Sequence, residues 1–179
     1  MLTTAQLSGL EFESLPSKEW GGVKVKVWHA RLPGRVAEWR GIGVDPGRNF
    51  GVSVINAHDI YVFSGEMPAE DAQWKYGIRA YDLMAQPQFY HGVGLAVVEG
   101  AAYKMPHGEA NLAYIRFGFV LGLYYGGYEV NMVPPATIRK GAFVSGKKSG
   151  LEVWPNLGPH AADSLGAAVY AVGVGEINK

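Results

Sequence analysis

The sequence RGIGVDPGRNFGVSVI, residues 40–55, predicts two apolar strands joined by a tight turn. The segment PGRN between them is rich in turn-forming residues. Asp45 ends the first strand, beside Pro46, at a point where its neighbours favour burial. After a short turn, residues 60–65 (IYVFSG) predict a third strand, so we expect an antiparallel meander with one carboxylate at its edge.

Composition narrows the class of protein. The chain has 179 residues, which suits one main domain with a sizeable core, and 48% of them are hydrophobic against 18% charged. There is no cysteine, which excludes disulfides, thiolate zinc sites and cysteine nucleophiles. The N-terminus lacks the pattern of a signal peptide, and no run of about 18 apolar residues predicts a membrane span. We therefore expect a soluble, cytoplasmic protein that needs no membrane.

Residues 1–40 differ from the rest and are predicted to be an N-terminal extension, an edge strand or small appendage, preceding a main domain at 41–179. Within the extension, Val23, Val25 and Val27 alternate with Lys24 and Lys26. This alternation predicts a half-buried strand, and exposed lysines are typical of an edge strand protected from further pairing.

The remainder of the chain alternates helices and strands. Helices are predicted over residues 68–86, 107–128 and 158–174, and strands over 94–100 and 129–135. The order of these elements makes the strand that ends at Asp45 parallel to the strand that carries Glu99. Both then end at the same edge of the sheet, where open sheets bind ligands.

The last predicted helix adds His160 and Asp163, which lie three residues apart and so share one face. Together with Asp45 and Glu99 they form an oxygen-rich set that suits Mg²⁺ or Mn²⁺. Two such ions can stabilise the attacking and leaving oxygens of a phosphodiester displacement. Each residue also has a structural interpretation: Asp45 as a turn former, Glu99 as a strand end that leaves the core, and the helix pair as first-turn residues.

Five motifs resemble RuvC-type Holliday-junction resolvases of the ribonuclease H-like nuclease superfamily, over about Gly41 to Val174. They are GIGVDPGRNFGVSVI, LAVVEGAAY, ANLAYIRFGFVLGLYY, VPPATIRKGAFVSGKKSG and PHAADSLGAAVYA, in that order. The resemblance implies an α/β ribonuclease H-like fold with a five-stranded mixed sheet, order 3-2-1-4-5, flanked by helices. It also implies a bacterial or phage-encoded protein.

The resemblance implies a function as well: paired nicking of Holliday junctions or other branched DNA by a homodimer that uses two Mg²⁺ ions per site, with Mn²⁺ able to substitute. Carried onto this sequence, the catalytic and metal-binding set is Asp45, Glu99, His160 and Asp163. Asp45 is expected to contact both ions, and Glu99 and Asp163 to complete the ligands. His160 either ligates one ion or positions the attacking water.

DNA contacts are predicted for a basic segment, because no acid occurs between Glu129 and Glu152. The candidates are Arg139, Lys140, Lys147 and Lys148, joined by Tyr103 and Lys104 after the strand-end Glu99. Tyr103 is the nearest match to the aromatic wedge of the family, slightly displaced. GAFVSGKK resembles a phosphate-binding loop but lacks its final Ser or Thr, so we interpret it as a basic loop that contacts phosphates.

The predicted helix 107–128 bears two apolar stripes. Ile115, Phe119 and Leu123 form one stripe, and Ala113, Phe117, Val120 and Tyr124 form the other. One stripe can pack on the sheet and the other needs a cover. That cover is either the second subunit of a dimer or another part of the same chain.

Three other functions fit parts of this sequence. Actin-like ATPases and sugar kinases share the strand-one D-x-G hairpin but need two such domains, which 179 residues cannot supply. A nuclease of viral DNA packaging uses acids on the same fold, and a non-catalytic branched-DNA-binding protein would keep the fold without the chemistry. The filled acidic positions favour the resolvase. Two further departures from the family are the leading forty residues and the short stretch before His160.

Overall fold

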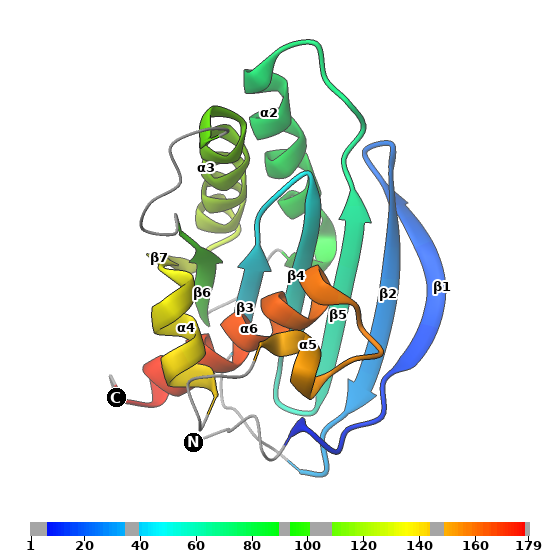
Figure 1. Ribbon diagram of the computed structural model, residues 1–179, viewed down its shortest axis with the longest axis vertical. Helices are drawn as coiled ribbons and strands as arrows, with labels where there is room; N and C mark the ends of the chain where they lie inside the picture. The colour runs from blue at the N-terminus through cyan, green and yellow to red at the C-terminus, as the bar shows by residue number, and fades with distance from the viewer. Residues whose placement is uncertain (1–6, 35–39, 90–93, 101–108, 144–148, 178–179) are drawn as a thin grey trace.

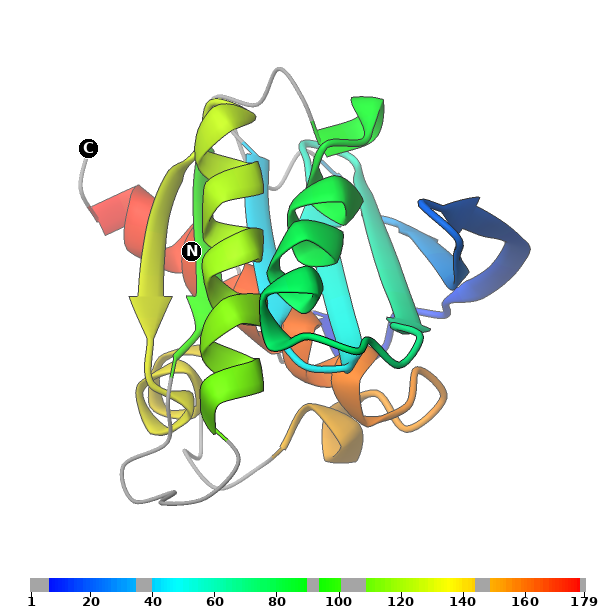
Figure 2. The same ribbon diagram turned by 90° about the horizontal axis from the view of Figure 1, so that it is seen from above.

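The computed structural model describes residues 7–34, 40–89, 94–100, 109–143 and 149–177, and it contains a seven-stranded mixed sheet with helices on both faces (Figures 1 and 2). The strand order is β1-β2-β5-β4-β3-β6-β7. The strands are β1 (Glu13–Trp20), β2 (Val23–Arg31), β3 (Arg40–Asp45), β4 (Asn49–Ile55), β5 (Asp59–Glu66), β6 (Gly94–Glu99) and β7 (Glu129–Val133).

The predicted order 3-2-1-4-5 is present as the series β5-β4-β3-β6-β7, but the predicted count of five strands is wrong. The N-terminal segment supplies the other two strands. β2 pairs with β5 on one side and with β1 on the other, so the strand with alternating valines and lysines is not at the edge of the sheet. The edge is β1, seen at the right of Figure 1. The local pattern indicated a half-buried strand correctly but did not identify its partners.

The middle of the sheet follows the predicted path. β3 pairs antiparallel with β4, and β4 with β5, through short turns. β3 pairs in parallel with β6, with Val44 opposite Val98. β6 in turn pairs in parallel with β7. The carboxyl ends of β3 and β6 therefore lie side by side, at the edge of the sheet where strands end and not at its outer strand β1.

Helices cover both faces (Figure 2). One face is covered by α2 (Gln73–Met84) and α3 (Glu109–Tyr125), and the other by α6 (Pro159–Ile177) with α4 (Pro135–Ala142) and α5 (Gly150–Val153) packed beside it. Each face has its own apolar core, in which alternate residues of the central strands are buried. In the described ranges no helix is long and apolar enough to cross a membrane.

Glycines let α2 and α3 approach closely. A Cβ at Gly118 would lie 2.1 Å from the carbonyl oxygen of Gly77, and one at Gly122 would lie 2.5 Å from the Cβ of Met84. α2 therefore covers part of α3 that the sheet does not. Phe117 and Tyr124 nevertheless remain exposed, at 61% and 65% of their surfaces.

Three short elements were not predicted: the helices α4 and α5 and a 3₁₀ helix. α4 begins at Pro135, where proline suits the first turn of a helix, so the strand predicted to reach residue 135 ends at Val133. α5 occupies the short stretch before His160, and a 3₁₀ helix, η1 (Pro87–Phe89), follows α2.

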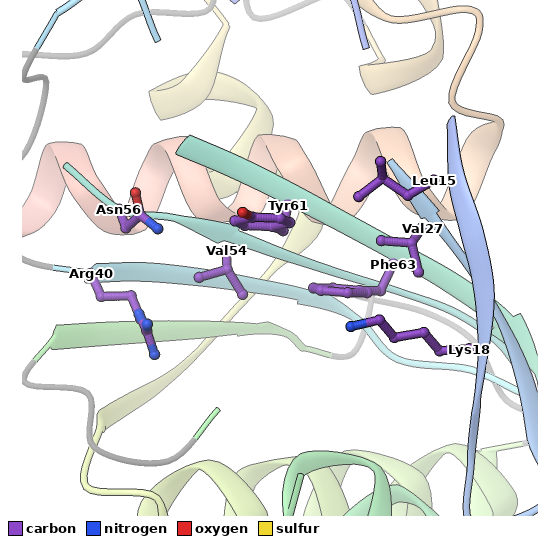
Figure 3. A pocket seen from close by; sticks show the side chains of 8 residues that line it. All are labelled: Leu15, Lys18, Val27, Arg40, Val54, Asn56, Tyr61 and Phe63. Carbon is purple, nitrogen blue, oxygen red and sulfur yellow. The ribbon is translucent and has the colours of Figure 1, made fainter. Parts of the chain in front are cut away.

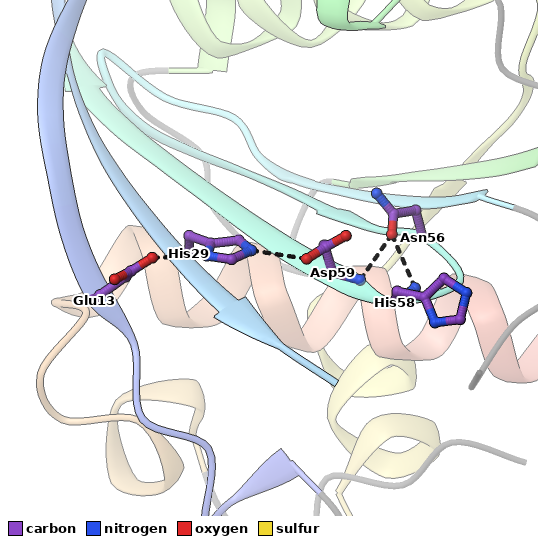
Figure 4. A network of polar contacts seen from close by, with 5 residues as sticks. All are labelled: Glu13, His29, Asn56, His58 and Asp59. Carbon is purple, nitrogen blue, oxygen red and sulfur yellow. Dashed lines mark hydrogen bonds and ion pairs between the residues drawn. The ribbon is translucent and has the colours of Figure 1, made fainter. Parts of the chain in front are cut away.

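A polar network joins the N-terminal hairpin to the rest of the sheet (Figure 4). His29 on β2 lies between two carboxylates, with Nδ1 3.0 Å from Oε1 of Glu13 on β1 and Nε2 2.9 Å from Oδ1 of Asp59 on β5. The pKa of His29 is raised, first by the hydrogen bond to Asp59, against burial, which lowers it. Asn56 fixes the adjacent turn, because its Oδ1 accepts the backbone N–H groups of His58 and Asp59.

Candidate active site

Asp45 and Glu99 lie at the same edge and on the same face of the sheet. The parallel register that pairs Val44 with Val98 leaves these two carboxylates side by side at the ends of β3 and β6. Leu95 and Val97 pack into the core beneath α6, and side chains alternate along a strand, so Glu99 faces α6. Gly43 also faces α6, and Asp45 follows it by two residues.

The N-terminal part of α6 lies against this face because β3 and β4 present glycines to it. A Cβ at Gly43 would lie 2.1 Å from the carbonyl oxygen of Ser164, and one at Gly51 would lie 2.0 Å from that of His160. Side chains at either position would displace the helix. A buried hydrogen bond of 2.8 Å between the hydroxyls of Ser53 and Ser164 fixes the register of α6 along β4.

Asp45 and His160 are in direct contact. The Nδ1 atom of His160 lies 2.8 Å from Oδ2 of Asp45, with the ring as donor and the carboxylate as acceptor. The Asp45 side chain is 16% exposed and that of His160 is 43% exposed. The hydrogen bond to Asp45 is the main reason that the pKa of His160 is raised above its ordinary value. The imidazole is therefore oriented by the strand-end acid.

Glu99 is the most perturbed of the carboxyl groups whose pKa is shifted. Burial, followed by the charges of Asp45 and Asp163, raises its pKa to about 7, while Arg139 and Arg116 oppose the shift. Such a value means that the carboxylate is deprived of water and surrounded by like charge. Strong perturbation of this kind is typical of functional sites.

Asp163 is held one turn further along α6. Its Oδ1 accepts the backbone N–H of Gly150 at 3.1 Å, which ties the start of α5 to α6. The pKa of Asp163 is raised by burial and then by the charge of Asp45, whereas the hydrogen bond from Gly150 lowers it. The four predicted site residues thus share one electrostatic environment.

This donor set fits a hard divalent cation. Three carboxylates and an imidazole are ligands that Mg²⁺ and Mn²⁺ accept, and a cation among them would relieve the repulsion that raises the pKa of Glu99. Among the described residues, however, no three His, Asp or Glu side chains are already arranged to hold an ion. The assignment of metal ligands to Asp45, Glu99, His160 and Asp163 stays a prediction.

Arg139 and Lys140 are exposed in the last turn of α4. Arg139 is close enough to the acids for its charge to lower the pKa of both Glu99 and Asp163. The other predicted DNA contacts lie outside the described residues; they are Tyr103, Lys104, Lys147 and Lys148.

Sequence reasoning missed Arg116, which approaches Glu99 from α3 on the opposite face of the sheet. A signal was available, since Arg116 is the only charged residue between Leu112 and Tyr125. The two apolar stripes of this helix alone give Arg116 no role.

A pocket elsewhere on the molecule is not part of this site. It has a volume of about 300 Å³ and lies on the α2–α3 side of the sheet (Figure 3). Its lining residues are Leu15, Lys18, Val27, Arg40, Val54, Asn56, Tyr61 and Phe63. Arg40 begins β3 whereas Asp45 ends it, so the two locations are separated along the strand.

Comparison with solved structures identifies the fold. A Thermus thermophilus RuvC structure matches with a TM-score of 0.58 and 13% identity, covering 78% of this chain and 97% of that chain. T. thermophilus RuvC in complex with Holliday junction substrate matches with a TM-score of 0.60 and 14% identity, covering 79% and 97%. No family model and no curated protein sequence matches. The predicted resemblance to RuvC is confirmed at the level of structure, with a RuvC-like, ribonuclease H-like fold.

Proposed function

We propose that this protein is a divalent-metal-dependent endonuclease that resolves Holliday junctions or other branched DNA by paired nicks. The observation that carries the proposal is the convergence of Asp45, Glu99, His160 and Asp163 at one edge of a RuvC-like sheet. One of the matching structures is T. thermophilus RuvC in complex with Holliday junction substrate, which supports branched DNA as the substrate class.

Mg²⁺ bound by these residues would supply a Lewis acid and an activated water for hydrolysis of the phosphodiester bond. Asp45 is central among the candidate ligands, because it contacts His160 and its charge acts on both Glu99 and Asp163. Asp45 would contact both ions, and Glu99 and Asp163 would complete the set of ligands.

The hydrogen bond to Asp45 determines what His160 can do. When the ring is neutral, Nδ1 carries the proton that Asp45 accepts, and Nε2 keeps a free lone pair. Ligation of an ion and orientation of an attacking water both use that lone pair, so either role needs the Asp45 contact. His160 is 43% exposed, which leaves the ring open to solvent and substrate.

Phosphate contacts are assigned to the basic residues near the acids. Arg139 is exposed beside Glu99 and Asp163, and Lys140 follows it on α4. We extend the same role to Lys147 and Lys148 because of their place in the sequence, and a contact with the branch point to Tyr103 and Lys104.

We further propose that the working unit is a homodimer, since paired nicks on a two-fold substrate match two related active sites. The exposed stripe of α3 supports this assembly. Ile115 and Phe119 are buried, whereas Phe117 and Tyr124 are exposed in spite of the cover that α2 provides. Exposed aromatic side chains of this kind are typical of protein interfaces.

Cleavage of synthetic DNA tests the proposal. Four-way junctions, flaps and linear duplexes are incubated with the protein and Mg²⁺, Mn²⁺ or a chelator. We expect metal-dependent, paired cleavage of the junction, abolished in Asp45→Asn, Glu99→Gln and Asp163→Asn but retained in the matched control Asp82→Asn, an exposed acid on α2. Junction binding should persist in all four variants, because each exchange removes charge but little volume.

The rival functions give different results. Equal cleavage of linear duplex and junction would favour a packaging-type nuclease over a resolvase. Junction binding without cleavage under either metal would leave a non-catalytic branched-DNA-binding protein. Near wild-type cleavage by Asp45→Asn would show that the proposed site is wrong.

A further inference from the structure

Arg116 is a charged residue in an otherwise apolar part of α3. α3 is apolar on nearly all sides after Leu112, and its one cation from there to Tyr125 lies next to Ile115, which is fully buried. The Arg116 side chain is itself only partly exposed. An arginine used only for solubility would extend into water from an exposed position.

The Nε–H group of Arg116 is buried and has no hydrogen-bond acceptor within the described parts of the chain. A guanidinium does not lose its proton in a protein, so the charge stays. Burying a charged donor without an acceptor is unfavourable, and such groups are rare in folded proteins. Within the described residues the guanidinium has no hydrogen bond and no ion pair, so its terminal nitrogens are available to a bound molecule.

Arg116 lies on α3, which packs against β6, the strand that ends at Glu99. Its charge lowers the pKa of Glu99, as does that of Arg139, which reaches the same carboxylate from α4 on the other face. Over the described ranges Arg116 forms no ion pair with Glu99 or with another acid within 4.0 Å. The guanidinium is therefore near the end of β6 without being neutralised there.

We propose that Arg116 binds the phosphate group that is cleaved, donating through its two terminal nitrogens to its non-bridging oxygens. This inference rests on the proposed nuclease function and adds a substrate-binding residue from the face of the sheet opposite α6. The planar fork of donors in a guanidinium matches two oxygens of one phosphate, and the resulting charge-assisted bonds are strong. A fixed positive group at this place would also stabilise the charge that develops on those oxygens during displacement.

A thermodynamic cycle on DNA binding tests the assignment. The cleaved phosphate is first mapped with wild-type protein and Mg²⁺. Binding of a junction with one methylphosphonate at that phosphate, which removes its charge, is then compared with binding of the unmodified junction, using Ca²⁺ in place of Mg²⁺ so that the readout is affinity. Wild type, Arg116→Met and Arg31→Met are compared; Arg31 is an exposed arginine at the other end of the sheet.

We expect the methylphosphonate to weaken wild-type binding by about tenfold or more, the size of a charge-assisted hydrogen bond. Arg116→Met should lose a similar factor on the unmodified junction and little more on the modified one, whereas Arg31→Met should respond to the modification as wild type does. A methylphosphonate at a distant phosphate should show no such coupling. Additive effects of Arg116→Met and the modification at the cleaved phosphate would overturn the proposal.

Thermal unfolding separates a structural role from this one. If Arg116 binds DNA and does not stabilise the fold, Arg116→Met should melt at or above the wild-type temperature in the absence of DNA, because an unsatisfied donor is removed. A lower melting temperature together with unchanged DNA affinity would also overturn the proposal. Should the methionine variant fail to fold, Arg116→Lys, which keeps the charge but loses the fork, enters the same cycle. Wild-type protein that neither binds nor cuts branched DNA would instead refute the proposed function, and the role of Arg116 with it.

Discussion

Replacing Gly43 by alanine should displace α6 from the sheet and thereby weaken the contact between His160 on α6 and Asp45 on β3. The new Cβ would lie 2.1 Å from both the carbonyl oxygen of Ser164 and the backbone nitrogen of Ala168. Both atoms belong to the helix backbone, so no side-chain rotation can relieve the overlap. To reach ordinary van der Waals contact, the helix would have to retreat by about 1.4 Å.

That retreat is large compared with the geometry of the site. The hydrogen bond between His160 and Asp45 is 2.8 Å long, and bonds of this type weaken beyond about 3.2 Å. Overpacking of a core costs about 1–3 kcal/mol, and an overlap with backbone should lie at the upper end, near 3 kcal/mol. For a domain with a free energy of unfolding of about 5–15 kcal/mol, Gly43→Ala should still fold but be clearly weakened.

Urea unfolding measures the loss of stability, and NMR titration of His160 measures the loss of its contact. Without the hydrogen bond to Asp45, the raised pKa of His160 should fall toward its ordinary value. Gly100→Ala is the matched control beside Glu99, because its Cβ would meet Val133 at 3.5 Å, an ordinary contact. The control should change stability by less than about 0.5 kcal/mol. A Gly43→Ala protein as stable as this control would refute the close approach of α6.

Three further predictions follow from individual contacts. Because the pKa of His29 is raised, first by the hydrogen bond to Asp59, the contribution of His29 to stability should be complete below its ordinary pKa of 6.5 and should be lost as pH rises through the raised value. His29→Gln should therefore flatten the decline in unfolding free energy as pH rises above 6.5, and an unchanged pH profile would contradict the role of the network. In the buried hydroxyl pair, Ser164 donates to a backbone carbonyl and so accepts from Ser53; Ser164→Ala, which leaves a buried donor unsatisfied, should cost about 1–3 kcal/mol and more than Ser53→Ala, and the reverse order in urea unfolding would contradict this donor assignment. Phe117→Asp should convert a sedimenting dimer to monomer without loss of thermal stability, since this side chain is 61% exposed, and an unchanged sedimentation coefficient would place the interface elsewhere.

The sequence was sufficient for the centre of the sheet because the decisive signals there are local. The turn between β3 and β4 spans three residues and the turn between β4 and β5 also spans three, so antiparallel pairing has little alternative. The single crossover through α2 then makes β6 parallel to β3. The convergence of Asp45 and Glu99 follows from that topology without further information.

The N-terminal hairpin could not be placed in this way. The alternation in β2 indicates which residues are buried but carries no information on which strand lies beside it. Its pairing with β5 is fixed by long-range contacts, among them the contact of His29 with Asp59. Arg116 was missed for a similar reason, since its approach to Glu99 depends on how α3 crosses the end of β6.

The electrostatics of the site explain why a folded chain would keep these groups together. Burial and mutual repulsion raise the pKa of Glu99 to about 7 even though two arginines oppose the shift, so the positive charge that the chain supplies is not sufficient to compensate the acids. Within the described part of the chain, neither arginine forms an ion pair with Glu99. An ion pair would have compensated the charge of the Glu99 carboxylate. The acids at the centre therefore favour a cation, whereas the arginines at either side favour an anion. Metal ions together with a phosphate group satisfy both demands at once, which neither a structural ion pair nor a simple turn motif would do.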